Sequence, residues 1–233
     1  MPDKTIEDYA GEMTGPSTRE FEAFGSTLRG VGADAQTEWR ALQSATSAMV
    51  TDGRSAADKI TKLRADTTLP RDHRFDAAVK LQDTTKTLIA KYHEGAQAAA
   101  GRLEGALVNG LLPRPVADSG QRMLARDEIR TLIGNRSGTA MVGAVMGHLG
   151  KNPSHDAELL SGFGESLFAG HGASDSFGAV KAKAVQTWLA RADGTERQQA
   201  NRKALKAFGA SNVAARVVAY RQAGLMLLGQ HDR

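Results

Sequence analysis

The chain of 233 residues contains no cysteine. Disulfide bonds, thiolate metal ligands and cysteine nucleophiles are therefore excluded. Aromatic residues make up only 5% of the sequence, whereas glycine alone contributes 25 residues. A core of this composition has to be built mainly from Leu, Val, Ile, Met and Ala on closely packed helices.

Long hydrophobic runs are also missing. The longest uncharged apolar stretch, residues 137–149, contains glycines, hydroxyl residues and His148, so it is too short and too polar to span a bilayer. Residues 1–8 are acidic and lack an apolar centre, so we expect no signal peptide there. We expect a soluble protein that makes no membrane contact and is not secreted by a signal peptide.

Motifs for nucleotide binding and hydrolysis are missing as well: the chain has no Walker loop, dinucleotide fingerprint, G-x-S-x-G or H-E-x-x-H. One catalytic-looking dipeptide remains, His155-Asp156, with His148 before it and Asp175 and Asp193 after it. These ligand types resemble those of the HD phosphohydrolase superfamily, all-helical proteins whose metal ion activates water.

That resemblance implies a metal-dependent hydrolase as a third functional hypothesis. The competing interpretation is structural, because His155-Asp156 follows Pro153-Ser154 at the start of a short helix, where an Asp favours the helix dipole. We expect no enzyme activity, no cofactor and no metal site.

Charge is distributed unevenly along the chain. Residues 1–119 carry 15 Lys and Arg against 17 Asp and Glu, whereas residues 120–233 carry 15 against 9. An acidic half joined to a basic half favours head-to-tail contacts between copies, or binding of an acidic partner at the basic end.

Apolar or small residues recur at steps of three and four between Ser17 and Thr68. They are Phe21, Phe24, Leu28, Val31, Ala35, Trp39, Leu42, Ala45, Met49, Ala56, Ile60 and Leu63. This spacing predicts one face of a long helix, with Leu42 and Met49 buried at its seam. Ser17 and Glu20 fit a capping box at its start. Three glycines between residues 25 and 32 predict a kink or a close backbone approach.

A second long helix is predicted from Asp72 to about residue 110. Its expected inward side includes Phe75, Ala78, Leu81, Leu88, Ile89, Tyr92, Ala96, Ala99, Leu103 and Ala106. The short connection through Leu69-Pro70 requires the two helices to fold back on each other. Residues 17–110 are therefore predicted to form a long antiparallel helical hairpin. Residues 1–16, which lack periodicity, are expected to be an N-terminal arm.

Residues 111–118 contain two prolines and are predicted to be a linker. The remaining residues, 119–233, show shorter helical patterns near 119–133, 138–149, 154–169, 175–192, 195–208 and 211–228. We expect them to form one small helical domain. No strand pattern occurs, so the predicted fold class is all-α: a long antiparallel helical hairpin followed by a compact bundle of short helices.

Basic residues are concentrated between Lys181 and Arg221. The segment from Leu205 to Val213 is similar to the helix–turn–helix of DNA-binding proteins, in which the second helix enters a groove. Contact with nucleic acid or an acidic partner is the second functional hypothesis. Its candidate residues are Arg197, Arg202, Lys203, Lys206 and Arg216. The alternative is a solvated or protein-facing basic surface.

Three stretches carry a family resemblance: LLPRP at 111–115, QRMLARDEIR at 121–130 and NPSHDAELL at 152–160. They look like helical virion-assembly proteins of tailed bacteriophages, which pair a long helical hairpin with a small helical domain. The resemblance covers about residues 70–170 and implies a non-enzymatic role in the head or the head–tail connector.

The leading hypothesis is therefore a structural or assembly protein that acts in multiple copies. Its expected partners are other copies of itself and further virion proteins, with possible non-specific DNA contact. The expected location is the virion or the cytoplasm of the host cell. Self-association is expected because the two-helix hairpin should leave an apolar strip uncovered.

Overall fold

The computed structural model describes residues 6–229, which form an all-α fold without a strand in that range. The predicted fold class is confirmed. The chain divides into two compact units. The first consists of the residues up to Leu107 together with those from Lys203 onward, and the second is Val108–Arg202.

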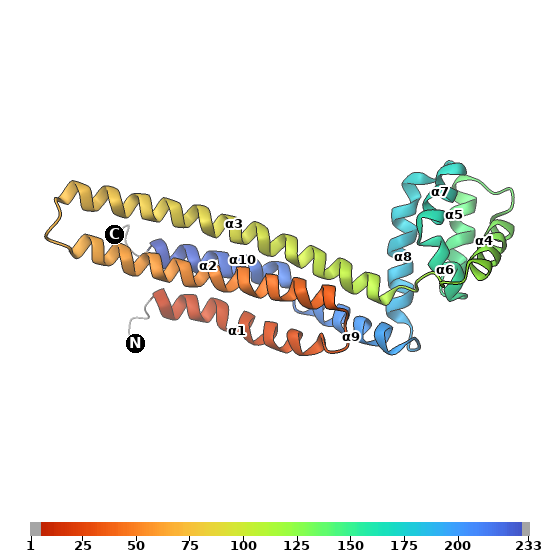
Figure 1. The fold of residues 1–233 in the computed structure, drawn as a ribbon, viewed down its shortest axis with the longest axis horizontal. Helices are drawn as coiled ribbons and strands as arrows, with labels where there is room; N and C mark the ends of the chain where they lie inside the picture. Colours follow the sequence, from red (N-terminus) through yellow and green to blue (C-terminus); the bar gives the residue numbers. More distant parts are fainter. Residues whose placement is uncertain (1–5, 230–233) are drawn as a thin grey trace. The chain divides into compact units, whose positions relative to one another are not determined.

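The first unit is built on a hairpin of two long antiparallel helices (Figure 1). These are α2 (Ala33–Ala65) and α3 (Arg71–Leu111). Polar contacts between the two helices include a hydrogen bond from the Tyr92 hydroxyl to Asp52 at 2.9 Å and an ion pair of Arg102 with Glu38 at 2.9 Å. The predicted seam of α2 is also confirmed, because Leu42 and Met49 are fully buried.

The helix predicted to begin at Ser17 begins earlier. In the structure α1 spans Ile6–Thr27, so most of the expected N-terminal arm is helical; residues 1–5 lie outside the described part. The helix continues through Gly15 and Pro16 because tertiary contacts outweigh local propensity. Ala10 is buried against Ala223 and Leu227, and hydroxyls of the next turns bond back to carbonyls of α1.

The predicted kink near residue 30 is a complete break between α1 and α2. Gly30 has a φ of 81°, which a residue with a side chain rarely adopts. The amides of Leu28 and Val31 bond to carbonyls three residues back, and the chain reverses there. The expected helix of residues 17–68 is thus two antiparallel helices.

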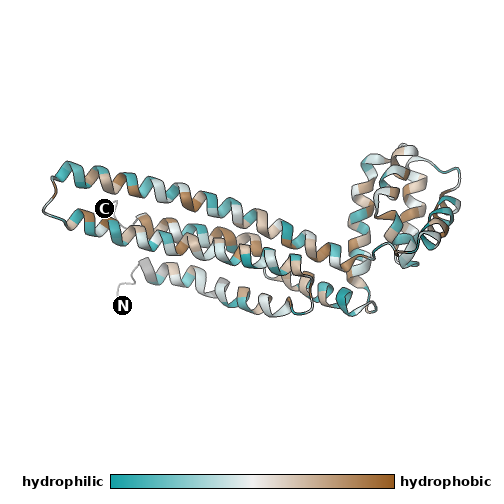
Figure 2. Ribbon diagram, in the orientation of Figure 1, coloured by the Kyte–Doolittle hydropathy of each residue, from teal (hydrophilic) through white to brown (hydrophobic). Residues whose placement is uncertain are grey.

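The C-terminal helix α10 (Val213–Gly229) belongs to the first unit, where it lies alongside α1 and α2 (Figure 1). Its contact with α2 is very close: a Cβ added to Gly53 would lie 2.6 Å from the carbonyl oxygen of Gly224. A Cβ on Gly224 would clash with the carbonyl of Met49. Glycine at both positions lets the two backbones touch. Figure 2 shows more hydrophobic residues on α10 than on the preceding helix α9 (Glu196–Ala210).

The expected small domain of residues 119–233 therefore differs from the observed division, because residues from Lys203 onward join the first unit. Apolar periodicity predicts that α10 is buried but not which helices cover it. The prediction that the hairpin leaves an apolar strip uncovered is also wrong for most of the aromatic residues named for it. Phe21 and Phe24 pack edge-on against Trp39, Tyr220 stacks on Phe21, and all four side chains are buried.

Two residues of α3 depart from their predicted inward orientation. Phe75 is 59% exposed and Leu88 is 37% exposed. Ala78, Ile89, Ala96, Ala99 and Leu103 are buried as expected. The inward face of α3 is therefore narrower than the set of apolar residues in its sequence.

The second unit contains five short α-helices and one turn of 3₁₀-helix among its described elements. They are α4 (Ser119–Ile133), α5 (Gly138–His148), α6 (Pro153–Leu159), α7 (Gly162–Gly170), η1 (Ser174–Ser176) and α8 (Phe177–Ala190). The helix predicted for 154–169 is divided into α6 and α7 at Leu160-Ser161. The Asp118 carboxylate caps α4 by accepting from the amide of Gln121 at 2.7 Å.

The core of the second unit is aliphatic with two aromatic rings. Its buried members include Ile129, Ile133, Met141, Val145, Leu159, Phe168, Phe177 and Val180. Residues 112–118 of the predicted linker are non-helical, and Leu111 still belongs to α3. The division between the two units falls earlier, after Leu107.

Candidate functional site

Two of the five predicted basic contact residues are engaged inside the fold. Arg202 is only 7% exposed; its Nε donates to the carbonyl of Trp188 at 3.2 Å and its Nη2 to that of Asp193 at 2.7 Å. Arg216 donates to the carbonyl of Ser211 and is paired with the Glu20 carboxylate of α1. Both guanidinium groups therefore form intramolecular bonds.

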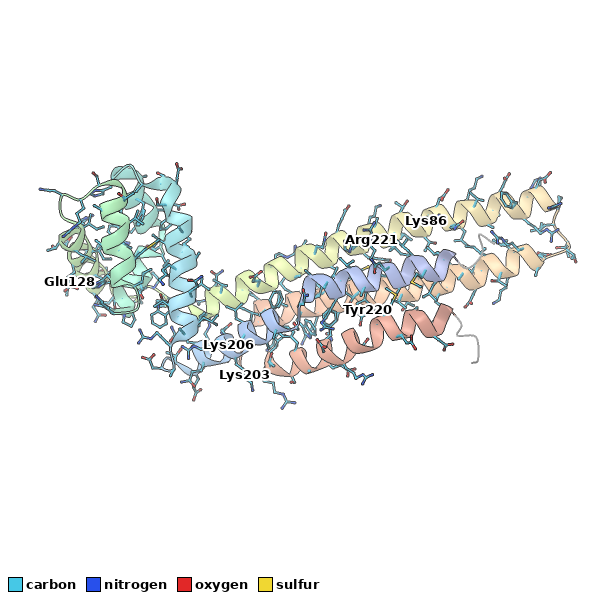
Figure 3. The ribbon with its side chains drawn as sticks, turned by 180° about the vertical axis from the view of Figure 1, so that it is seen from behind. Lys86, Glu128, Lys203, Lys206, Tyr220 and Arg221 are labelled. Carbon is cyan, nitrogen blue, oxygen red and sulfur yellow. The ribbon has the colours of Figure 1, made fainter. Side chains whose placement is uncertain are left out.

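The other three candidates, Arg197, Lys203 and Lys206, are exposed on α9. Figure 3 labels the two lysines on this helix. Lys203 and Lys206 are three residues apart and therefore lie on one side of the helix. The surface available to an acidic partner is thus smaller than the sequence predicts.

The resemblance to a helix–turn–helix is not matched by the surroundings of its second helix. α10 buries Val213, Val217 and Tyr220 in the first unit. A recognition helix needs a face that can enter a groove. Near the start of α10, the polar residues that a groove could meet are Asn212, which precedes the helix, and Arg216, which is partly buried.

The structure brings His148 and His155 together. His148 Nε2 lies 2.9 Å from His155 Nδ1, and His155 Nε2 lies 2.5 Å from the Glu128 carboxylate of α4. The ring centroids are 5.1 Å apart with planes 22° from parallel, so the rings meet nearly in line through their nitrogens. Glu128 is labelled on α4 in Figure 3. We name this arrangement the Glu128–His155–His148 chain.

Asp156 turns to a different set of partners. Its Oδ2 accepts from the Trp188 indole at 2.8 Å and from the Gly150 amide at 2.8 Å. Its Oδ1 is buried without a hydrogen-bond partner among the described residues. Burial raises the pKa of Asp156, and the bonds from Gly150 and Trp188 offset part of that rise.

The remaining carboxylates of the HD-like pattern are not part of this cluster. Asp193 is held by Arg191, with Oδ1 at 2.7 Å and Oδ2 at 2.5 Å from the guanidinium nitrogens, and Asp175 lies in η1. Within residues 6–229, no three His, Asp or Glu side chains are arranged so that they could hold a metal ion.

Sequence reasoning missed Glu158, a buried anchor for α4. Its two carboxylate oxygens accept from Arg122 at 2.7 Å and from Arg126 at 2.6 Å. Burial raises the pKa of Glu158, but the two arginines outweigh burial and hold the pKa below its ordinary value. The four-residue spacing of Arg122 and Arg126, which puts both on one face of α4, is the signal that predicts such a shared acid.

The first unit holds a groove of about 340 Å³ between α1 and α2, with Tyr220 of α10 on its wall. Several of its hydroxyls are bonded within the chain: Thr18 to Tyr220 at 2.7 Å, Thr14 to Ala10 and Thr46 to Leu42. Glu22 is the charged residue in its lining, and that lining has no nucleophile paired with a base.

Large apolar side chains are exposed in both units. On α4, Met123 and Leu124 are 64% and 62% exposed. Around the turn between α2 and α3, Leu69 and Phe75 are 42% and 59% exposed. Adjacent apolar residues that face solvent are typical of protein–protein contacts.

No helix within residues 6–229 has both the length and the apolar character needed to cross a membrane. Searches of protein-family models, curated proteins and solved structures found no match to this chain.

Proposed function

We propose that the chain is a non-enzymatic structural or assembly protein that works in multiple copies through protein–protein contacts. The observation that carries the proposal is the pair Met123 and Leu124 on α4, both more than 60% exposed. On α4, Arg122 and Arg126 bind Glu158, whereas Met123 and Leu124 face solvent. Leaving apolar side chains in water loses the stabilisation that burial would give them, and a partner that covers them recovers it.

The resemblance of residues 70–170 to helical virion-assembly proteins favours the head or the head–tail connector of a tailed bacteriophage as the setting. Contacts with other virion proteins belong to this proposal. Mass spectrometry of purified virions from the source phage tests it: the chain should be present at a fixed copy number. Its absence from virions and from assembly intermediates would exclude a virion role.

Light scattering during size exclusion at micromolar concentration tests the multimeric state. We expect a mass above that of the single 24.7 kDa chain. Replacing both Met123→Ser and Leu124→Ser should lower that mass, whereas Gln121→Ser with Thr131→Ser, on exposed positions of the same helix, should not. A wild-type mass of one chain, unchanged by added partners, contradicts the proposal.

A second candidate function, non-specific binding of nucleic acid, is favoured by exposed Arg197, Lys203 and Lys206 on α9. Each phosphate contact releases counterions, so binding should weaken steeply with salt. Arg202 is unsuitable for testing this surface because its guanidinium is buried. The test is Lys203→Glu with Lys206→Glu, which should weaken binding and flatten its salt dependence.

A further inference from the structure

The Glu128–His155–His148 chain joins three helices of the second unit through one line of hydrogen bonds. Glu128 comes from α4, His148 from the last turn of α5 and His155 from α6. Glu128 is half exposed, whereas the His155 side chain is only 9% exposed. The chain therefore links a surface carboxylate to the buried His155 and the half-buried His148.

The geometry fixes where protons can reside. The Glu128 carboxylate accepts, so His155 Nε2 carries hydrogen. The 2.9 Å contact between His155 Nδ1 and His148 Nε2 then needs one hydrogen and one lone pair. Neutral imidazoles meet that requirement, and so does a pair with one added proton. Two added protons place hydrogen on both facing nitrogens, and the bond is lost.

The surroundings of His148 contain groups that favour its charged form. The buried Asp156 Oδ1 has no hydrogen-bond partner among the described residues, and the Asp156 charge favours the protonated form of His148. The end of α5 also favours a cation through the helix dipole. Both effects favour a proton on His148.

We propose that the Glu128–His155–His148 chain is an acid-operated latch, which holds the last turn of α5 against α6 until both imidazoles are charged and the hydrogen bond between them is lost. The movement stays local. Gly150, two residues beyond His148, remains tied by its amide to Asp156 and by its carbonyl to Arg191.

The charged groups around the latch act in known directions. Burial is the main cause that lowers the pKa of His148, followed by the charges of His155 and Lys151, and Asp156 opposes them. Arg191, which follows α8, interacts with Asp156. On α4, Arg122 and Arg126 form ion pairs with Glu158. The carboxylate of Glu128, on the same helix, bonds to His155.

Side-chain NMR of the histidines in the full chain, from pH 7.5 to 4.5, tests the latch. We expect the imidazole pair to take up its second proton at a lower pH than its first, because the first charge opposes the second. As the pH falls toward the second step, amide exchange at the end of α5 should accelerate by up to about tenfold per pH unit and should level off below that step, after correction for intrinsic exchange.

Two variants and a control sharpen the test. His148→Gln retains a donor for His155 but no titrating ring, so His155 should titrate in one step and the exchange step should vanish. Asp156→Asn should move the second step to lower pH. The control is His73→Gln at an exposed position of α3, which should leave both steps unchanged. Independent, single-step titration of both histidines in the wild type, or exchange that does not follow the second step, overturns the latch.

Discussion

The two units are stabilised by different means. The first consists of helices as long as 33 and 41 residues, which meet through apolar seams, an aromatic cluster and a glycine contact between α2 and α10. The second consists of helices of 7 to 15 residues, tied together by buried polar groups such as Glu158 and Asp156. A short helix exposes many backbone groups at its ends relative to the apolar area it buries. Polar anchors compensate for that shortage in the second unit.

The largest effect is expected from a charge in the apolar seam of the first unit. Leu42→Asp should destabilise this unit by at least about 3 kcal/mol, because Leu42 is fully buried and the substitution places a carboxylate in an apolar seam. Urea denaturation followed by circular dichroism measures the loss. Wild-type stability of this variant would show that Leu42 is not at the seam.

The glycine contact predicts opposite signs for two similar substitutions. Gly224→Ala should destabilise by about 1–3 kcal/mol, because the new methyl group meets the carbonyl of Met49. Gly95→Ala, at an open position of α3, should stabilise by up to about 1 kcal/mol through helix propensity. If denaturation curves showed the same change in stability for Gly224→Ala and Gly95→Ala, the close backbone contact between α2 and α10 would be contradicted.

The stability of the second unit should fall when the charge of Glu158 is removed and the size of the side chain is kept. Glu158→Gln should destabilise it by about 1–2 kcal/mol, since the shared negative charge is lost and one of the two acceptor oxygens becomes an NH2 group, while Arg122 and Arg126 stay partly solvated. The control Glu165→Gln, exposed on α7, should have little effect. Hydrogen exchange of α4 and α6 amides reports on this unit separately.

Glu158 also predicts an acid dependence of the second unit. Its folded-state pKa lies below the ordinary 4.5, so its stabilising contribution is complete above that pH and is lost as the pH falls below it. The α4 amides should therefore lose protection below about pH 4.5 in the wild type and show a smaller change in Glu158→Gln. An identical acid profile in both proteins would contradict the role of Glu158.

The smallest effect on stability is expected at the surface of α9. Lys203→Glu with Lys206→Glu should change the free energy of unfolding by less than about 0.5 kcal/mol. Both side chains are exposed, in contrast to Arg202 one residue away. Thermal denaturation measures this, and a large loss would mean that the two lysines have structural partners.

Helical periodicity gave the buried face of α2, as Leu42 and Met49 show, and it located α4 and α8 to within two residues. It could not reveal that Arg202 is buried, because charge predicts exposure unless carbonyl acceptors such as those of Trp188 and Asp193 are brought near by the fold. The position of Arg202 three residues before Leu205, on the same helix face, was the available signal.

The break at Gly30 and the continuation through Pro16 show a similar limit. Glycine and proline mark places where a helix is weak, but contacts with distant residues decide whether it ends there. Ala10 is buried against Ala223 and Leu227, more than 200 residues away in sequence, and no local pattern contains that information.

The place of α10 in the first unit has a consequence for the order of folding during synthesis. Residues 108–202 form an insertion between the two sequence segments of the first unit. All parts of the inserted unit leave the ribosome before α10 does, so it can complete its core first. The hydrogen bond between Thr18 and Tyr220 can form only after Tyr220, 202 residues later in the sequence, has been synthesised. Until then the faces of α1 and α2 that receive α10 are open to water, and a nascent chain stalled at that stage is the species most in need of a chaperone.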